Sequence, residues 1–230
     1  MSYPAEPVGG LRCLIVDPGT SATTSVVLIL HGYGMQPDDL APFTSSLQLE
    51  AAFYLPEAPL PAVPSGRAWW PIDQAQRATA MAVGPRDLRA EHPLGAESAR
   101  RLLGGVVDEI RRRHPGVPMV LVGFSQGGML ACDAVLRDGL SIAGLALLSA
   151  SRISTDEWAP LAARLAKLPV LVSHGTRDSD LGFHAGEGLR DFCSEAGAAV
   201  TWVPFEGEHG IPLVVWRALR KFIRALADQP

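Results

Sequence analysis

The stretch that decides the fold is residues 118–136, which read PMVLVGFSQGGMLACDAVL. An apolar run ends at Gly123 and a helix-compatible run begins at Gln126, so the segment predicts a strand, a sharp turn and a helix. Ser125 stands at the apex between glycines, where a Cβ would collide with the neighbouring strand or helix. An ordinary tight turn also fits this spacing. The strand before it and the helix after it favour an exposed serine nucleophile near the positive end of a helix.

Short apolar runs alternate with amphipathic segments along the rest of the chain. The expected strands are Leu11–Asp17, Val26–Leu30, Ala52–Leu55, Met119–Gly123, Leu145–Ser149, Val170–Ser173 and Val200–Pro204. The expected helices are Pro37–Leu49, Ala96–Arg113, Gln126–Arg137, Thr155–Lys167, Leu181–Ala196 and Ile211–Leu226. This alternation predicts an α/β fold with a mainly parallel central sheet and helices on both faces. The interval from residue 149 to 170 has room for one helix, so we expect a single domain over residues 1–230 and no cap domain.

Composition and charge narrow the class of protein. The chain has 230 residues, 47% of them hydrophobic and 19% charged, which is typical of one globular domain. The net charge is −4 and the longest basic cluster is residues 111–113, so a nucleic-acid partner is not expected. Cys13, Cys132 and Cys193 show no metal-like spacing and fit a reducing compartment. The N-terminus lacks the regions of a signal peptide, and no apolar run has membrane-spanning length. We therefore expect a cytoplasmic protein without stable membrane insertion.

One stretch, Pro56–Gly95, breaks the alternation. It contains seven prolines and carries the pair Trp69 and Trp70 near its middle. Prolines at this density suppress regular structure, and a long loop in a compact domain is often functional. We expect this loop to form a wall of a shallow, open substrate site, to which Leu181 also contributes. The alternative is an ordinary surface loop whose tryptophans pack on the core.

A serine hydroxyl needs a base, and His209 is the best candidate. In folds with such an elbow, the acid and the base follow the serine on loops after later strands. His209 is flanked by glycines in such a loop, where an imidazole can reach Ser125. His184 falls in an expected helix, and His174 stands at a strand end, where a structural hydrogen bond is the expected role.

Two aspartates compete for the role of the acid that orients His209. Asp178 and Asp180 both follow the strand over residues 170–173, and Glu206 and Glu208 remain weaker alternatives. The first aspartate after a His-Gly turn is expected to point inward, which favours Asp178. Asp180 is then expected to cap the helix that follows it.

The negative oxygen formed during acyl transfer requires hydrogen-bond donors. The backbone N–H of Gln126, directly after the nucleophile, is one candidate. The other is expected in the loop after the strand Val26–Leu30, where glycines surround Tyr33 and let backbone N–H groups face the site. A glycine turn that serves only the fold is the alternative.

These segments together resemble the phospholipase/carboxylesterase family of α/β-hydrolases, which includes the acyl-protein thioesterases. The resemblance lies in residues 30–34 (LHGYG), 67–72 (RAWWPI), 123–128 (GFSQGG), 174–178 (HGTRD) and 207–209 (GEH). It implies Ser125, Asp178 and His209 as catalytic residues, with Tyr33 and Gln126 as oxyanion donors. The chain departs from the family at residues 181–182 and at Pro71, positions that border the substrate channel in relatives.

We therefore expect a serine hydrolase that cleaves carboxylic esters, and thioesters by the same chemistry, of short- to medium-chain acyl groups. No metal or organic cofactor is expected, and the protein is expected to be a monomer or homodimer. Two alternatives stay open. One is a dienelactone-type or acyl-peptide hydrolase, since fold does not choose a substrate. The other is a binding protein that kept the fold without turnover.

Overall fold

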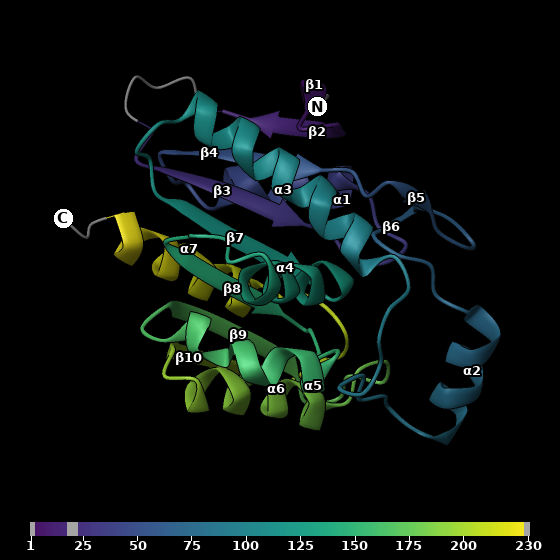
Figure 1. Cartoon of the computed structure of the whole chain (residues 1–230). Coiled ribbons are helices and arrows are strands. Elements are labelled where there is room, and N and C mark those ends of the chain that lie inside the picture. The colour runs from purple at the N-terminus through teal and green to yellow at the C-terminus, as the bar shows by residue number, and fades with distance from the viewer. Residues whose placement is uncertain (1–2, 18–22, 228–230) are drawn as a thin grey trace.

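An eight-stranded sheet forms the centre of the molecule (Figure 1). The structure, a computed structural model, describes residues 3–17 and 23–227. The strands run in the order β1-β2-β4-β3-β7-β8-β9-β10; β2 pairs antiparallel with β1 and β4, and every other pair is parallel. Their bounds are β1 Ala5–Val8, β2 Leu11–Val16, β3 Ser25–Leu30, β4 Ala51–Pro56, β7 Met119–Phe124, β8 Gly144–Leu148, β9 Pro169–Gly175 and β10 Ala199–Phe205. The predicted α/β fold with a mainly parallel sheet is confirmed.

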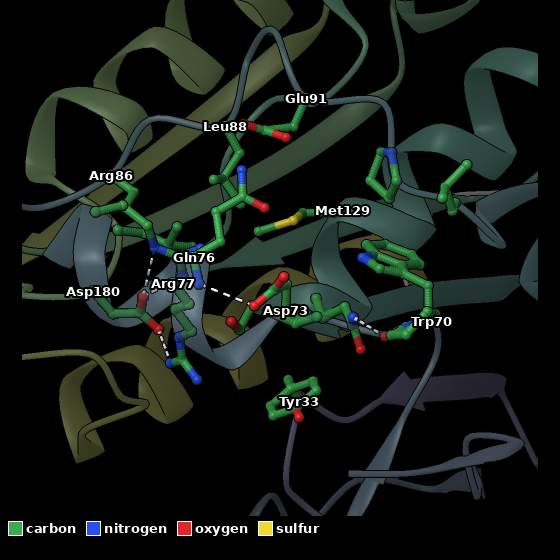
Figure 2. A pocket seen from close by; sticks show the side chains of 18 of the residues that line it. Tyr33, Trp70, Asp73, Gln76, Arg77, Arg86, Leu88, Glu91, Met129 and Asp180 are labelled. Atoms are coloured by element: carbon green, nitrogen blue, oxygen red, sulfur yellow. Dashed lines mark hydrogen bonds and ion pairs between the residues drawn. The ribbon is translucent and has the colours of Figure 1, made fainter. Parts of the chain in front are cut away.

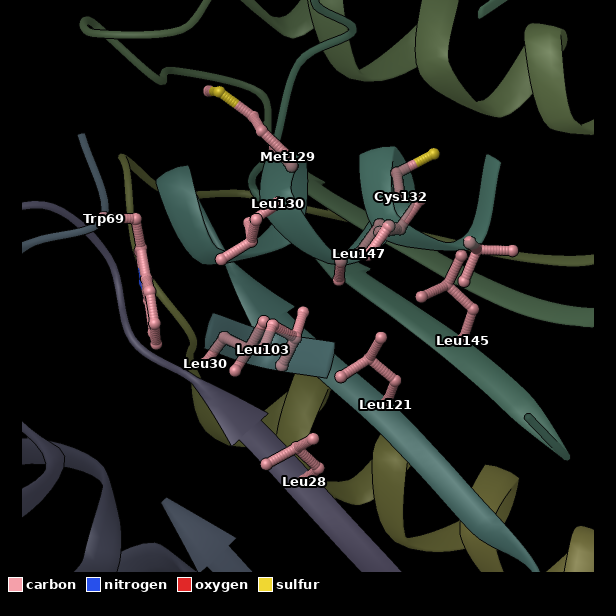
Figure 3. Packing of buried hydrophobic residues seen from close by; sticks show 14 of the residues in the cluster. Leu28, Leu30, Trp69, Leu103, Leu121, Met129, Leu130, Cys132, Leu145 and Leu147 are labelled. Atoms are coloured by element: carbon pink, nitrogen blue, oxygen red, sulfur yellow. The ribbon is translucent and has the colours of Figure 1, made fainter. Parts of the chain in front are cut away.

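Helices cover both faces of this sheet and enclose two buried apolar clusters. One cluster contains residues of α1 (Pro37–Ser46) and α7 (Leu213–Ala227). The other contains residues of α3 (Ala96–Arg113), α4 (Gln126–Arg137) and α6 (Phe183–Glu195). Because side chains alternate across a pleated strand, neighbouring residues of β3 enter different clusters. Figure 3 shows one side of this division, where Leu28 and Leu30 pack with Leu121 and Leu147.

The helix expected over Thr155–Lys167 is wrong in its length and type. The α-helical part, α5, covers only Thr155–Trp158, and a 3₁₀ helix continues over Ala159–Leu165. Pro160 lies at the start of the second segment, where it lacks the N–H that an α-helix would need. These short elements are all that separates β8 from β9, so no cap domain is inserted there.

The stretch from Pro56 to Gly95 is more regular than its prolines predict. It contains a two-stranded hairpin, β5 (Leu60–Pro61) with β6 (Arg67–Ala68), and a helix, α2 (Gln74–Val83). Residues 72–84 contain no proline, and the Asp73 carboxylate caps α2 by accepting backbone hydrogen bonds at 2.9 and 3.0 Å. α2 has no buried residue and stands away from the sheet in Figure 1. The expectation of an irregular loop is therefore wrong for this part.

The order of the strands decides where a site can form. The chain leaves β3 for β4 on one side and later places β7 on the other side of β3. In open α/β sheets, ligands bind beyond the carboxyl ends of strands at such a change of direction. The loop after β3 and the serine turn after β7 meet there.

In the described ranges, no helix is both long and apolar enough to cross a membrane.

Candidate active site

Ser125 lies at the tip of a strained turn between β7 and α4. Its φ is 52° and its ψ is −118°, in the left-handed range that residues with a Cβ rarely adopt. The glycines around it are required by space: a Cβ on Gly127 would lie 2.4 Å from the Leu30 carbonyl oxygen, and one on Gly123 would lie 2.3 Å from the Gly127 oxygen. The backbone of this turn therefore packs against β3, and the serine side chain is directed out of the sheet at the start of α4.

The structure brings the three predicted catalytic residues into one hydrogen-bonded row. The Nε2 atom of His209 lies 2.9 Å from Ser125 Oγ, and its Nδ1 atom lies 2.6 Å from Asp178 Oδ2. An ionised carboxylate only accepts hydrogen bonds, so Nδ1 carries the proton and Nε2 is free to accept one from the serine. The serine, histidine and aspartate come from the loops after β7, β10 and β9. The arrangement has the geometry that activates a serine hydroxyl.

Asp178 is buried and held by donors on both carboxylate oxygens. Oδ1 accepts the backbone N–H groups of Asp180 and Leu181, each at 2.9 Å. Oδ2 accepts from His209 and lies 3.2 Å from His174 Nε2. Burial by itself raises the pKa of Asp178, but the hydrogen bonds from His174 and His209 outweigh it and hold the pKa well below its usual range. The lowered pKa favours the ionised carboxylate at neutral pH.

The sequence predicts that Asp180 caps the next helix, and this prediction is wrong. α6 begins after Gly182, and no side-chain cap hydrogen bond is present at that end. The Asp180 carboxylate instead pairs with Arg77 of α2 at 2.5 Å and with Arg86. Burial raises the pKa of Asp180, while these two arginines lower it by a larger amount. Asp180 thus links the loop that carries Asp178 to the segment that contains α2.

Ser149, which the sequence analysis did not single out, supports the histidine loop. It follows β8 with a φ of 45°, is fully buried, and its Oγ donates to the carbonyl of Gly210 at 3.1 Å. This contact fixes the residue next to His209. The positive φ of a serine after a strand is set by its tertiary surroundings, so no local sequence signal marks it.

The two candidate oxyanion donors belong to Tyr33 and Gln126, which both line the pocket that contains Ser125. Within the described part of the chain, the backbone N–H groups of Tyr33 and Gln126 donate to no acceptor. The loop that carries Tyr33 is fixed by His31, whose Nε2 accepts from the Ala58 backbone at 3.1 Å and whose Nδ1 donates to the Gly32 carbonyl at 2.8 Å. Burial lowers the pKa of His31, which keeps this ring neutral.

A pocket of about 820 Å³ opens beside Ser125 and extends between α2 and α4. Trp70 and Leu181, which the sequence analysis places in the substrate wall, line this pocket together with Met129. Figure 2 shows Arg77 and Arg86 in its wall, both directed at Asp180. A pocket of this size is large enough to hold a small organic ligand.

Trp69, also expected in the substrate wall, does not line this pocket. It is 1% exposed and packs in the core, where its Nε1–H donates to the His31 carbonyl at 2.9 Å. Its backbone N–H donates to the side chain of Gln126, again at 2.9 Å. Trp69 therefore connects this segment to the loop that carries Tyr33 and to the start of α4, and Trp70 is the tryptophan that lines the pocket.

Over residues 3–17 and 23–227, no three histidine, cysteine, aspartate or glutamate side chains gather as metal ligands would. The buried cysteines Cys13, Cys132 and Cys193 lie in the protein interior, and burial raises the pKa of each thiol. Ser125, His209 and the two residues with candidate N–H donors, Tyr33 and Gln126, line the pocket.

Comparisons with known proteins agree with this fold. The chain matches the model of the phospholipase/carboxylesterase family over residues 11–227. Carboxylesterase SOBER1 of Arabidopsis thaliana is 25% identical over 198 residues, which span 79% of this chain and 81% of the relative. Acyl-protein thioesterase 1 of Neurospora crassa is 24% identical over 208 residues, 84% of this chain and 82% of the relative. The crystal structure of esterase PE8 superposes with a TM-score of 0.76 at 24% identity, covering 92% of this chain and 97% of that one.

The sheet order, the serine turn and these structural neighbours define an α/β-hydrolase. More narrowly, the chain belongs to the phospholipase/carboxylesterase family. It is an esterase-type hydrolase, as the family and the names of its relatives indicate.

Proposed function

We propose that the protein hydrolyses carboxylic esters, and thioesters by the same chemistry, through an acyl-enzyme on Ser125. The observation that carries this proposal is the row of two short contacts, 2.9 Å from Ser125 Oγ to His209 Nε2 and 2.6 Å from His209 Nδ1 to Asp178. A serine that only stabilised a turn would need neither a histidine on its hydroxyl nor a carboxylate behind that histidine.

In this mechanism His209 removes the proton from Ser125 as its oxygen attacks the substrate carbonyl. The oxyanion that forms is stabilised by the free N–H groups of Tyr33 and Gln126. His209 then gives its proton to the leaving alcohol or thiol, and the acyl group remains on the serine. In the second half it activates a water, which releases the acid and restores the hydroxyl. Asp178 holds the productive tautomer and stabilises the imidazolium without taking the proton.

The substrate is a small ester or thioester whose acyl group is of short to medium length. The apolar wall formed by Trp70, Leu181 and Met129 supports this choice, since it can bury several methylenes next to the serine. The relatives named carboxylesterase and acyl-protein thioesterase support both classes of carbonyl substrate. Residues 1–230 act as one domain in this proposal.

The test is labelling by a fluorophosphonate, which forms a covalent bond only with an activated serine. The wild type should be labelled and Ser125→Ala should not, while both keep the same circular dichroism spectrum. Ser98→Ala, an exposed serine on α3, is the matched control and should label like the wild type. Undiminished labelling of Ser125→Ala would place the nucleophile elsewhere in the chain.

A further inference from the structure

A second histidine, His174, contacts the same carboxylate oxygen of the candidate acid as His209 does. It belongs to β9, and its side chain is 0% exposed. Its Nε2 atom lies 3.2 Å from Asp178 Oδ2 and 2.9 Å from the carbonyl oxygen of Leu181. Both neighbours are acceptors, so Nε2 must carry a hydrogen that it shares between them.

The other ring nitrogen fixes the charge of this imidazole. The Nδ1 atom of His174 is buried and has no hydrogen-bond partner among the described residues. A proton there would create a buried N–H without an acceptor, which is costly, so the ring is held as its neutral Nε2–H tautomer. Within the described ranges, Asp178 is the only charged group at ion-pair distance from His174. His174 therefore presents the carboxylate with a dipole and no charge.

Gly186 of α6 leaves the space that the imidazole ring of His174 occupies. A Cβ on Gly186 would lie 2.4 Å from both Cγ and Nδ1 of His174, so only glycine allows the ring to sit where it does. The ring of Phe183 meets it edge-on, with centroids 6.4 Å apart. With Leu181 and Asp178 on its Nε2 side, the imidazole has one orientation, and that orientation aims its N–H at Asp178 Oδ2.

We infer that His174 is a positioning residue, which acts on the serine only through Asp178 and His209; the inference rests on the proposed function. It adds a fourth donor to the carboxylate and holds Oδ2 at the correct place for His209 Nδ1. It also draws negative charge away from Oδ2. The imidazolium that forms on His209 during catalysis therefore faces a carboxylate whose direction is fixed and whose basicity is moderated.

The test is a matched pair of substitutions at this position. Glutamine places an amide N–H at the same number of bonds from the backbone as Nε2, and methionine places a methyl group there. For His174→Met, we expect kcat to fall on the order of 10-fold with KM nearly unchanged, because Oδ2 loses the donor that holds it in line with His209 Nδ1. We also expect the acid limb of the kcat/KM profile to move to higher pH, by a few tenths of a unit or more, because a less solvated carboxylate holds the imidazolium more strongly. His174→Gln should keep kcat and the acid limb close to those of the wild type.

The thermal unfolding midpoints of both variants are measured in parallel. If His174 had a purely structural role, its replacement would lower these midpoints and leave kcat and the acid limb unchanged. If both variants lose stability while kcat and the acid limb remain those of the wild type, the inference is overturned. It is also overturned if glutamine and methionine impair kcat to the same degree with an unmoved limb. Should His174→Met fail to fold, Gly186→Ala displaces the ring without removing a polar group, and it should lower kcat and move the limb in the same way. An unchanged Gly186→Ala would then overturn it.

Ser125→Ala separates this outcome from a failure of the proposed function. If Ser125→Ala keeps full esterase activity, the serine mechanism itself is wrong. If it is inactive and the His174 variants behave like the wild type, only the positioning role fails.

Discussion

The substitution that probes the site most directly is Asp178→Asn. Each carboxylate oxygen of Asp178 faces two donors, the backbone N–H groups of Asp180 and Leu181 on one side and the rings of His209 and His174 on the other. An asparagine has only one oxygen, so its NH₂ group must oppose one of these pairs. The two possible orientations have different consequences for catalysis.

If the NH₂ group of the new asparagine faces His209, the imidazole can accept from it at Nδ1 and carry its own proton at Nε2. It then presents an N–H to Ser125 and cannot act as a base. If the NH₂ group faces the backbone instead, two buried N–H groups lose their acceptor, at about 1–3 kcal/mol each. The productive orientation is thus disfavoured by about 4 kcal/mol, which corresponds to about 10³-fold in rate. The missing negative charge adds to this, so we expect kcat to fall by about 10³–10⁴.

The assay is steady-state hydrolysis of p-nitrophenyl butyrate, with fluorophosphonate labelling to count competent sites. Asp180→Asn is the matched control, because it removes the neighbouring carboxylate and leaves all four donors on Asp178. It should cost far less activity. If Asp180→Asn were the inactive variant and Asp178→Asn kept most of its kcat, the assignment of the acid and the tautomer argument would both be wrong.

Three further outcomes are expected. Trp70→Ala should flatten the rise of kcat/KM over p-nitrophenyl esters of increasing acyl length and leave turnover of the acetate ester largely unchanged, because each methylene buried against Trp70 contributes at most about 0.8 kcal/mol. A rise that continues to long acyl chains in the variant would place the acyl channel elsewhere. Asp180→Asn should lower the free energy of unfolding in urea by about 1–3 kcal/mol at pH 7. The folded-state pKa of Asp180 is lowered, so its stabilisation is complete above the unfolded value of about 3.9 and is lost below it. The difference between wild type and variant should therefore shrink from about pH 5 downward, and a difference that grows on acidification would contradict the ion pairs. Gly127→Ala should unfold more easily than the wild type and label poorly, since its Cβ would lie 2.4 Å from the backbone oxygen of Leu30; normal labelling would show that the turn can relax.

The sequence by itself determined the features that depend on short stretches of chain. The turn at Ser125 can be read locally, because its glycines and its flanking strand and helix are neighbours in sequence. The loops that carry Asp178 and His209 follow recognisable buried strands, and parallel strands place their following loops at one edge of the sheet. The chain order of serine, aspartate and histidine was therefore enough to predict which side chains would meet.

Other features depend on contacts between distant segments, and only the tertiary structure decided them. Trp69 and Trp70 are adjacent and chemically identical, yet Trp69 is buried against His31 and Trp70 lines the pocket. Asp180 has the local setting of a helix cap, but arginines 103 and 94 residues away offer a partly buried carboxylate a stronger partner than a helix end. The sequence around His174 indicates an ordinary strand-end residue, and only the tertiary structure places Gly186 of α6 against its ring. In each case the position of the side chain is decided by the free energy gained when a polar or aromatic group is buried against a partner that the local sequence does not contain.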